Sequence, residues 1–213
     1  MIRAFLFDMD GVLINSEELW HRIEPETLRN IVPNWNETLQ KHITGMSSRS
    51  VHVYLQAEHG VTESFSVFEE RYREAAKRIY SAEGALYPGV HEAIATAKKF
   101  GWKTAICSSS PTAWIQMMLE HFALAESFDV IVSADLLGGK GKPAPDVYVL
   151  TCRTLGVTPA ECITIEDSKN GIASAQAAGI FTYGFRNGFN TLEDVANADR
   201  IITDFSQIVW NDQ

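Results

Sequence analysis

The chain has 213 residues, 46% of them hydrophobic and 21% charged, which is an ordinary globular composition with room for a sizeable core. Its formal net charge of −9 argues against nucleic acid and anionic membranes as main partners. A divalent cation could still bring an anionic substrate to such an acidic protein. No uncharged apolar run approaches the ~20 residues of a membrane helix, and the first residues do not read as a signal peptide.

The first element predicted along the chain is a short buried strand over residues 2–8, which is apolar, rich in aromatic side chains and broken by Gly11. The pattern then changes over residues 16–83. Two segments there, 16–32 and 64–80, are charged and amphipathic, which predicts helices. No part of this stretch is typical of a strand.

Strands and helices alternate with short loops over the rest of the chain, which indicates βαβ units and a parallel sheet. Helices are predicted over 88–101, 111–124, 145–157 and 170–180, and strands over 102–110, 128–135, 161–168, 180–185 and 199–205. The expected fold class is α/β, a Rossmann-like parallel sheet flanked by helices, with a small α-helical domain inserted after the first strand. The expected domains are a core of residues 1–15 and 84–213 and an insertion of residues 16–83.

Polar side chains follow the predicted strands, and in an open parallel sheet ligands bind outside the carboxyl ends of the strands. The side chains that meet at this edge are Asp8 and Asp10, then Ser108, Ser109 and Ser110, then Lys142, and finally Glu166 and Asp167. Several carboxylates cannot share a site in ionised form without a cation. Because the available ligands are all oxygens, the pattern favours a hard ion, most plausibly Mg²⁺.

The same edge has the features of a phosphoryl pocket. The serine-rich turn before Pro111 offers hydroxyls and backbone N–H groups at a helix start, where anions bind. Lys142 would add a positive point charge. An aspartate in such a pocket can act as a nucleophile and form an acyl phosphate, and a second carboxyl can move protons.

Four segments carry a resemblance to a known family: FDMDGVLINSE, ICSSS, GKPAPDVY and IEDSKNGIASAQAAG. In this order, each after a predicted strand, they resemble the motifs of the haloacid dehalogenase (HAD) superfamily. The similarity is to its branch with a helical cap inserted after the first strand, which includes β-phosphoglucomutase-like proteins and sugar-phosphate phosphatases. It implies that residues 16–83 form a cap domain over a HAD-like core.

The resemblance implies a role for each matching residue. Asp8 would be the nucleophile that takes the phosphoryl group, and Asp10 would act first as general acid and then as general base. The Asp8 carboxylate, the Asp10 backbone carbonyl and Asp167 would hold Mg²⁺. Glu166 would support the metal directly or through water.

Further positions complete the implied site. Ser108, the Ser109 amide and Lys142 would bind the transferring phosphoryl group, and Gly11 would let the backbone turn close to it. Family members that act as dehalogenases lack the second aspartate, so the presence of Asp10 argues against dehalogenation.

One position distinguishes mutases from phosphatases within this branch. β-Phosphoglucomutase carries a histidine ten residues after its second aspartate, and the equivalent residue here is Trp20. His21 is adjacent, but one helical step turns a side chain by ~100°, so it would face elsewhere. Phosphatases of this branch often read DSEPLW, close to NSEELW here, which favours hydrolysis. Trp20 either packs on the sugar or holds the cap to the core.

Arg49, in TGMSSRS, falls near the position where mutase relatives carry an arginine that binds a distal phosphate. It is expected either to contact a substrate anion or to be a plain exposed arginine.

Other polar residues have simpler expected roles. Asp135, Asp146 and Asp194 are expected to form turns or cap helices. Ser110 could likewise only cap the helix that begins at Pro111. Lys140 is expected to be a solvated loop charge, because Lys142, which stands in the KPAPD context, matches the family lysine.

The predicted function is a Mg²⁺-dependent phosphomonoester hydrolase that acts on a small phosphorylated metabolite, such as a sugar or sugar-alcohol phosphate. A phosphosugar mutase and a non-catalytic binding protein on the same scaffold are the alternatives. The three cysteines, Cys107, Cys152 and Cys162, lie in apolar segments without metal-site spacing, which predicts reduced thiols and a cytoplasmic location. The protein is expected to be a monomer or weak dimer.

Overall fold

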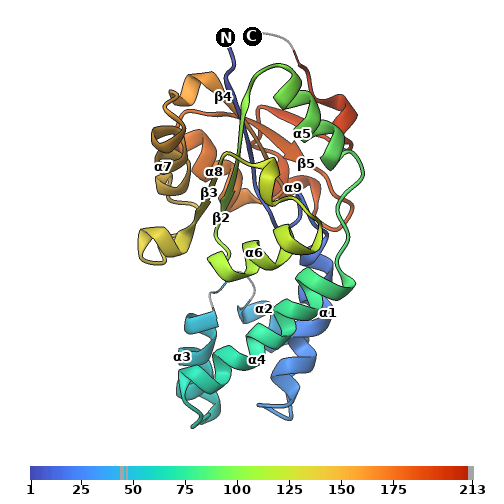
Figure 1. Ribbon diagram of the computed structural model, residues 1–213. Coiled ribbons are helices and arrows are strands. Elements are labelled where there is room, and N and C mark those ends of the chain that lie inside the picture. The colour runs from blue at the N-terminus through green and yellow to red at the C-terminus, as the bar shows by residue number, and fades with distance from the viewer. Residues whose placement is uncertain (44–45, 47, 211–213) are drawn as a thin grey trace. The chain divides into compact units, whose positions relative to one another are not determined.

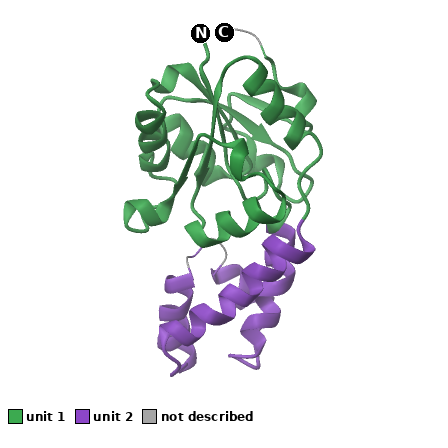
Figure 2. Cartoon of the chain, viewed as in Figure 1, with its two compact units in different colours: residues 1–16, 85–213 green, residues 17–84 purple. Residues whose placement is uncertain are grey.

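The computed structural model describes residues 1–43, 46 and 48–210, and they form two compact units. One unit, the core, consists of Met1–Ser16 and Ala85–Gln213, and the other, the helical unit, consists of Glu17–Gly84 (Figure 2). The helical unit therefore begins and ends one residue after the bounds expected from the sequence.

The core contains one parallel sheet with the strand order β3-β2-β1-β4-β5-β6. The strands are β1 (Ala4–Phe7), β2 (Lys103–Ser108), β3 (Val130–Ser133), β4 (Cys162–Glu166), β5 (Phe181–Phe185) and β6 (Arg200–Ile202). This confirms the predicted Rossmann-like α/β core. The two central strands, β1 and β4, are buried along their whole length, as their apolar sequences require.

Helices cover both faces of the sheet (Figure 1). The core helices are α5 (Val90–Lys99), α6 (Thr112–His121), α7 (Asp146–Leu155), α8 (Lys169–Ala177) and the short α9 (Leu192–Val195). On one face, α7 and α8 pack against alternate strand residues such as Ala4 and Leu6, which share one buried cluster with Val147 and Leu155. On the other face Phe5 and Phe7 stack, and α5 packs on β2.

The direction in which strands are added reverses between β1 and β4, which are neighbours in the sheet. In sheets of this kind the crevice at such a reversal is where ligands bind. The register pairs Phe7 with Ile165, so the residues that follow, Asp8 on one strand and Glu166 on the other, emerge at the same level. The fold therefore brings the first and fourth predicted motifs together.

The helical unit contains four α-helices and a closing π-helical turn, and its described residues contain no strand. The elements are α1 (Ser16–Arg29, whose first residue belongs to the core), α2 (Glu37–Ile43), α3 (Ser48–His59), α4 (Phe65–Arg78) and the turn Ile79–Glu83. Buried side chains from these helices, including Ile23, Leu28, Leu55 and Phe68, form a separate small core.

Several short elements were not predicted, because a single turn has no apolar period to detect. They are α9 and the 3-10 turns Ala125–Ser127, Ala134–Leu137, Pro159–Glu161 and Phe205–Gln207. Asp135 and Asp194 have the expected capping roles. The Thr112 amide donates to Asp135 at 2.8 Å, and Asp194 forms a capping box with Thr191.

All three cysteines are buried and free of disulfides, in agreement with the prediction. No helix in the described part of the chain is both long and apolar enough to cross a bilayer.

Candidate active site

Asp8 follows the last residue of β1 and lies at the centre of a buried group of charges. Its backbone N–H donates to the Ile165 carbonyl at 3.2 Å, which extends the pairing of β1 with β4 by one residue. Only 7% of Asp8 is exposed. Burial raises the pKa of Asp8 well above its ordinary value, Lys142 opposes this shift, and the Glu166 and Asp10 carboxylates add to it. An ionised Asp8 therefore needs more positive charge than Lys142 alone supplies.

Lys142 brings a cation to this group. Its Nζ lies 2.5 Å from Asp8 Oδ1 and 2.6 Å from Glu166 Oε1, and 6% of its side chain is exposed. Burial alone would lower the pKa of Lys142, but the two carboxylates raise it above its ordinary value, so the ammonium stays charged. Lys140, by contrast, pairs at 2.8 Å with Asp146 on the surface. The structure thus separates the two lysines as the sequence context predicted.

Glu166 ends β4 and is completely buried. The Tyr148 hydroxyl on α7 donates to its Oε1, which also pairs with Lys142. Its other oxygen, Oε2, is buried without a hydrogen-bond partner among the described residues. A Cβ added to Gly171 would lie 1.8 Å from that oxygen, so glycine at this position makes room for it. A buried carboxylate oxygen without a donor is a strong reason to expect a cation beside it.

Asp167, the next residue, packs against the turn that follows Asp8. Its Oδ2 accepts a hydrogen bond of 2.9 Å from the Asn187 amide, and it is 6% exposed. Gly11 has a φ of +74°, and a Cβ there would lie 1.9 Å from Asp167 Oδ2. Gly11 is therefore required for two reasons, its left-handed backbone and the close approach of Asp167. The sequence predicted a close approach at Gly11 by the phosphoryl group, and the structure adds the Asp167 carboxylate.

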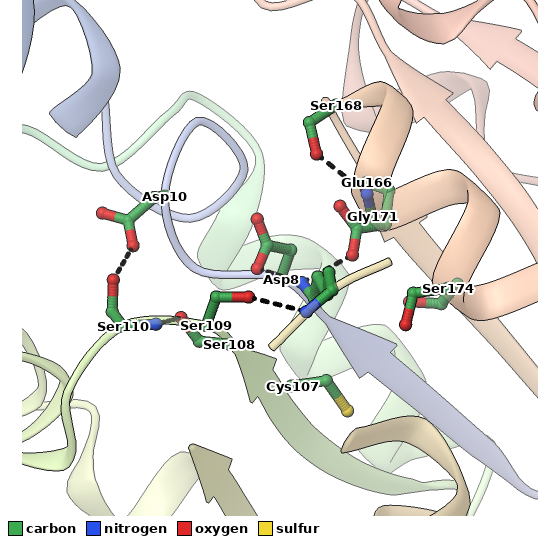
Figure 3. A network of polar contacts seen from close by, with 12 residues as sticks. Asp8, Asp10, Cys107, Ser108, Ser109, Ser110, Glu166, Ser168, Gly171 and Ser174 are labelled. Atoms are coloured by element: carbon green, nitrogen blue, oxygen red, sulfur yellow. Dashed lines mark hydrogen bonds and ion pairs between the residues drawn. The ribbon is translucent and has the colours of Figure 1, made fainter. Parts of the chain in front are cut away.

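Asp10 faces hydroxyl groups instead of the other carboxylates. Ser16 Oγ donates to its Oδ1 at 2.6 Å, and Ser110 Oγ donates to its Oδ2 at 2.5 Å. Figure 3 shows the Asp10 and Ser110 side chains pointing toward each other. These contacts fix the carboxyl group in place. They also settle what Ser110 does here: it holds Asp10, while Asp135 caps α6.

The serine turn after β2 connects the remaining predicted residues (Figure 3). Ser108 is buried, and its Oγ accepts from the Ser110 amide at 3.0 Å. Ser109 Oγ accepts from the Lys142 amide at 3.2 Å, which joins this turn to the loop that carries the lysine. All the core residues predicted from the sequence therefore belong to one connected group at the carboxyl edge of the sheet.

A metal ion fits the carboxylates of this group. Asp8, Glu166 and Asp167 each offer an oxygen, and these oxygens all lie within 4.8 Å of one another. The donor set is oxygen only, which suits a hard divalent cation. The unpartnered Glu166 Oε2 and the glycine beside it point to the same conclusion. These residues can hold a metal ion.

The two cap residues singled out from the sequence lie in the helical unit. Trp20 is half-buried on α1, where its indole N–H donates to the Tyr80 hydroxyl at 3.0 Å and its ring stacks on Tyr72. Arg49 is exposed on α3, with its guanidinium 4.1 Å from the centre of the Phe65 ring. Residues 44, 45 and 47 of the segment that suggested Arg49 lie outside the described residues. Substrate contact by Trp20 and Arg49 stays a prediction.

Four residues of the site were not predicted. Ser16 and Tyr148 lie inside the recognised segments, but nothing in the pattern showed which acceptor each hydroxyl meets. Asn187 and Asn190 follow β5, and the rule that polar residues after a strand join the site applies to them as well. Extending that rule to the fifth strand would have found both asparagines.

Comparison with known proteins agrees with this geometry. Residues 5–185 match the family described as haloacid dehalogenase-like hydrolase. The chain belongs to this family. The match confirms the resemblance drawn from the four segments and includes every residue assigned to the site except Asn187 and Asn190, which lie just beyond it.

Relatives of this HAD-like chain include two phosphatases. It is 32% identical over 179 residues to "Phosphorylated carbohydrates phosphatase" of Thermotoga maritima, covering 84% of this chain and 82% of that one. It is 34% identical over 180 residues to "Hexitol phosphatase B" of Escherichia coli K12, covering 83% and 80%. A solved structure of CbbY from Rhodobacter sphaeroides in complex with phosphate has a TM-score of 0.82, 28% identity, and coverage of 97% and 96%.

Proposed function

We propose that this protein is a phosphoric monoester hydrolase that acts on a small phosphorylated sugar or sugar alcohol. The observation that carries the proposal is the group formed by Asp8, Glu166, Asp167 and Lys142, in which three buried carboxylates lie beside one ammonium. The names of the two phosphatase relatives support the substrate class. The three buried free cysteines are consistent with a cytoplasmic location.

Mg²⁺ is the metal we propose for this site. Asp8, Asp167 and the Asp10 backbone carbonyl would hold it, and Glu166 would support it. When bound, it would supply positive charge for the phosphoryl oxygens and keep the nearby carboxylates ionised. Lys142 and the serine turn, through Ser108 and the Ser109 amide, would bind the same phosphoryl group.

The first chemical step would be attack by Asp8 on phosphorus. A bond forms between an Asp8 carboxylate oxygen and phosphorus, and the bond from phosphorus to the sugar oxygen breaks. Asp10 would give its proton to the departing oxygen, so that the alcohol leaves in neutral form. The hydroxyls of Ser16 and Ser110 keep Asp10 in a fixed position for this transfer.

The second step would release phosphate. Asp10, now a carboxylate, would take a proton from a water molecule, whose oxygen attacks the phosphorus of phospho-Asp8. The bond from phosphorus to Asp8 breaks, and the carboxylate is restored. The helical unit would act as a cap and exclude bulk water during these steps.

The decisive experiment is a panel of sugar and sugar-alcohol phosphates, assayed for inorganic phosphate with and without Mg²⁺. We expect Mg²⁺-dependent release from at least one of them. Asp8→Asn should abolish turnover without loss of the fold, and Asp10→Asn should slow both steps. Conversion of a sugar 1-phosphate to its 6-phosphate without phosphate release would show a mutase instead. Binding without any turnover across the panel would show a non-catalytic protein.

A further inference from the structure

The loop that follows β5, residues 186–191, is held together by hydrogen bonds of two asparagines, and we call it the asparagine loop. The Asn187 amide N–H donates to Asn190 Oδ1 at 3.2 Å, and the Asn190 amide N–H donates back to Asn187 Oδ1 at 3.0 Å. The Phe189 amide donates to the same Asn187 oxygen at 3.0 Å. Gly188, with a φ of +92°, permits this tight turn. The acceptor half of the Asn187 side chain therefore builds the loop itself.

The donor half of the same side chain reaches out of the loop. Asn187 Nδ2 donates to the Gly11 carbonyl at 2.9 Å and to Asp167 Oδ2 at 2.9 Å. Both amide hydrogens are used, so the side chain can take only one orientation. It joins three segments that are far apart in sequence: the turn after β1, the end of β4 and the loop after β5. Asn190 adds a contact to the backbone, because its Nδ2 donates to the Asp167 carbonyl at 2.7 Å.

This arrangement matters because Asp167 carries a carboxylate beside two others. The last torsion of an aspartate side chain is only weakly restricted, and repulsion from Asp8 and Glu166 would tend to turn the group away. A hydrogen bond to a charged acceptor is stronger than one to a neutral acceptor. The side-chain amide of Asn187 can therefore hold the Asp167 carboxylate against that repulsion.

We propose that Asn187 is a positioning residue that sets the affinity of the site for Mg²⁺ by fixing the Asp167 carboxylate. The inference rests on the proposed metal site and assigns Asn187 no contact with substrate. Loss of its side-chain amide should therefore weaken metal binding, and the Mg²⁺ dependence of turnover should shift with it.

Asn187→Ser is the variant of choice, because a serine hydroxyl can still accept from the amides two and three residues on and so preserve the turn. It lacks the two donors that reach Gly11 and Asp167. Asn187→Ala is the second variant. Thr191→Ala is the matched control, since Thr191 caps the helix at the end of the same loop and contacts Asp194 instead of Asp167.

Mg²⁺ affinity is measured by calorimetry on the whole protein without substrate, and melting temperature and the Mg²⁺ dependence of turnover are measured beside it. We expect the Mg²⁺ dissociation constant to rise about tenfold in both Asn187 variants, and the Mg²⁺ concentration for half-maximal turnover to rise by a similar factor. Thr191→Ala should lower the melting temperature and leave the dissociation constant within twofold.

Three results would overturn the inference: no Mg²⁺ binding by the wild-type protein, an unchanged dissociation constant in Asn187→Ser, or an equal rise in Thr191→Ala. If the wild type binds Mg²⁺ but releases no phosphate from any substrate, the proposed function fails. The calorimetric comparison of Asn187→Ser with Thr191→Ala still decides the role of Asn187 in that case.

Discussion

Gly11→Ala tests whether activity depends on the close approach of the Asp167 carboxylate to the turn after β1. The added Cβ would lie 1.9 Å from Asp167 Oδ2, whereas ordinary van der Waals contact begins near 3.4 Å. The carboxylate or the turn would have to move by about 1.5 Å, the difference between these two distances. Because a misplacement of ~1 Å can cost about 100-fold in rate, we expect kcat/KM for phosphate release to fall at least 100-fold.

The left-handed backbone at Gly11 makes a separate contribution to the loss of stability in Gly11→Ala, and a control variant can measure it. An alanine in the left-handed region costs about 1–2 kcal/mol, which in a chain of this size lowers Tm by roughly 2–8 °C. Gly101 has a φ of +72°, close to the +74° of Gly11, and a Cβ there meets nothing within 4 Å. Gly101→Ala should therefore lose similar stability and keep its activity.

The assay is phosphate release on the best substrate of the panel, at saturating Mg²⁺, beside thermal unfolding of both variants. If Gly11→Ala kept more than a tenth of the wild-type kcat/KM, the steric reasoning would be wrong. If Gly101→Ala lost activity to the same extent, the loss would reflect general destabilisation and not the displacement of Asp167.

Two further substitutions test other parts of the structure. Gly171→Ala should raise the Mg²⁺ concentration needed for half-maximal turnover at least tenfold, because its Cβ would displace Glu166 Oε2. Tm should fall, because the clash with a completely buried carboxyl group costs more than the ~1 kcal/mol that alanine gains in a helix. Unchanged Mg²⁺ dependence would contradict a supporting role for Glu166. In the helical unit, burial raises the pKa of Glu24 above its ordinary 4.5, although hydrogen bonds from Tyr72 and Gln40 oppose the shift. Its contribution to stability is then fully present below pH 4.5 and is lost as pH rises through the folded pKa. Urea unfolding should therefore show Glu24→Gln gaining stability relative to wild type as pH rises above 4.5. A stability difference that does not change with pH would refute this.

The sequence was sufficient to predict the sheet, because each strand is a short apolar run bounded by turn residues. Every predicted strand and helix of the core is present, with bounds that differ by a few residues. The ends of the predicted strands were sufficient to predict that Asp8, Ser108, Lys142 and Asp167 meet at one edge, since the carboxyl ends of parallel strands lie there. Elements of a single turn could not be predicted, because they are too short to show a periodic pattern of apolar residues.

The direction of individual side chains could not be predicted in the same way. Ser110 could have been a helix cap on sequence grounds, and only the structure shows its hydroxyl on Asp10. Tyr148 lies on α7 with its side chain buried, and only the structure shows that its hydroxyl donates to Glu166. Such contacts depend on how two distant segments pack, which no local pattern encodes.

The charges of the site explain why two aspartates stand one residue apart. Asp8, Glu166 and Asp167 bring three carboxylates together, and Lys142 returns one positive charge, so the group carries two negative charges when all are ionised. One divalent cation balances this charge, which is the condition that an ionised, buried Asp8 requires. Asp10 accepts hydrogen bonds from the Ser16 and Ser110 hydroxyls, although its carboxylate also adds to the raised pKa of Asp8. The short spacing between the two aspartates therefore gives the proposed nucleophile and the proposed proton carrier different partners, Lys142 for Asp8 and two serine hydroxyls for Asp10.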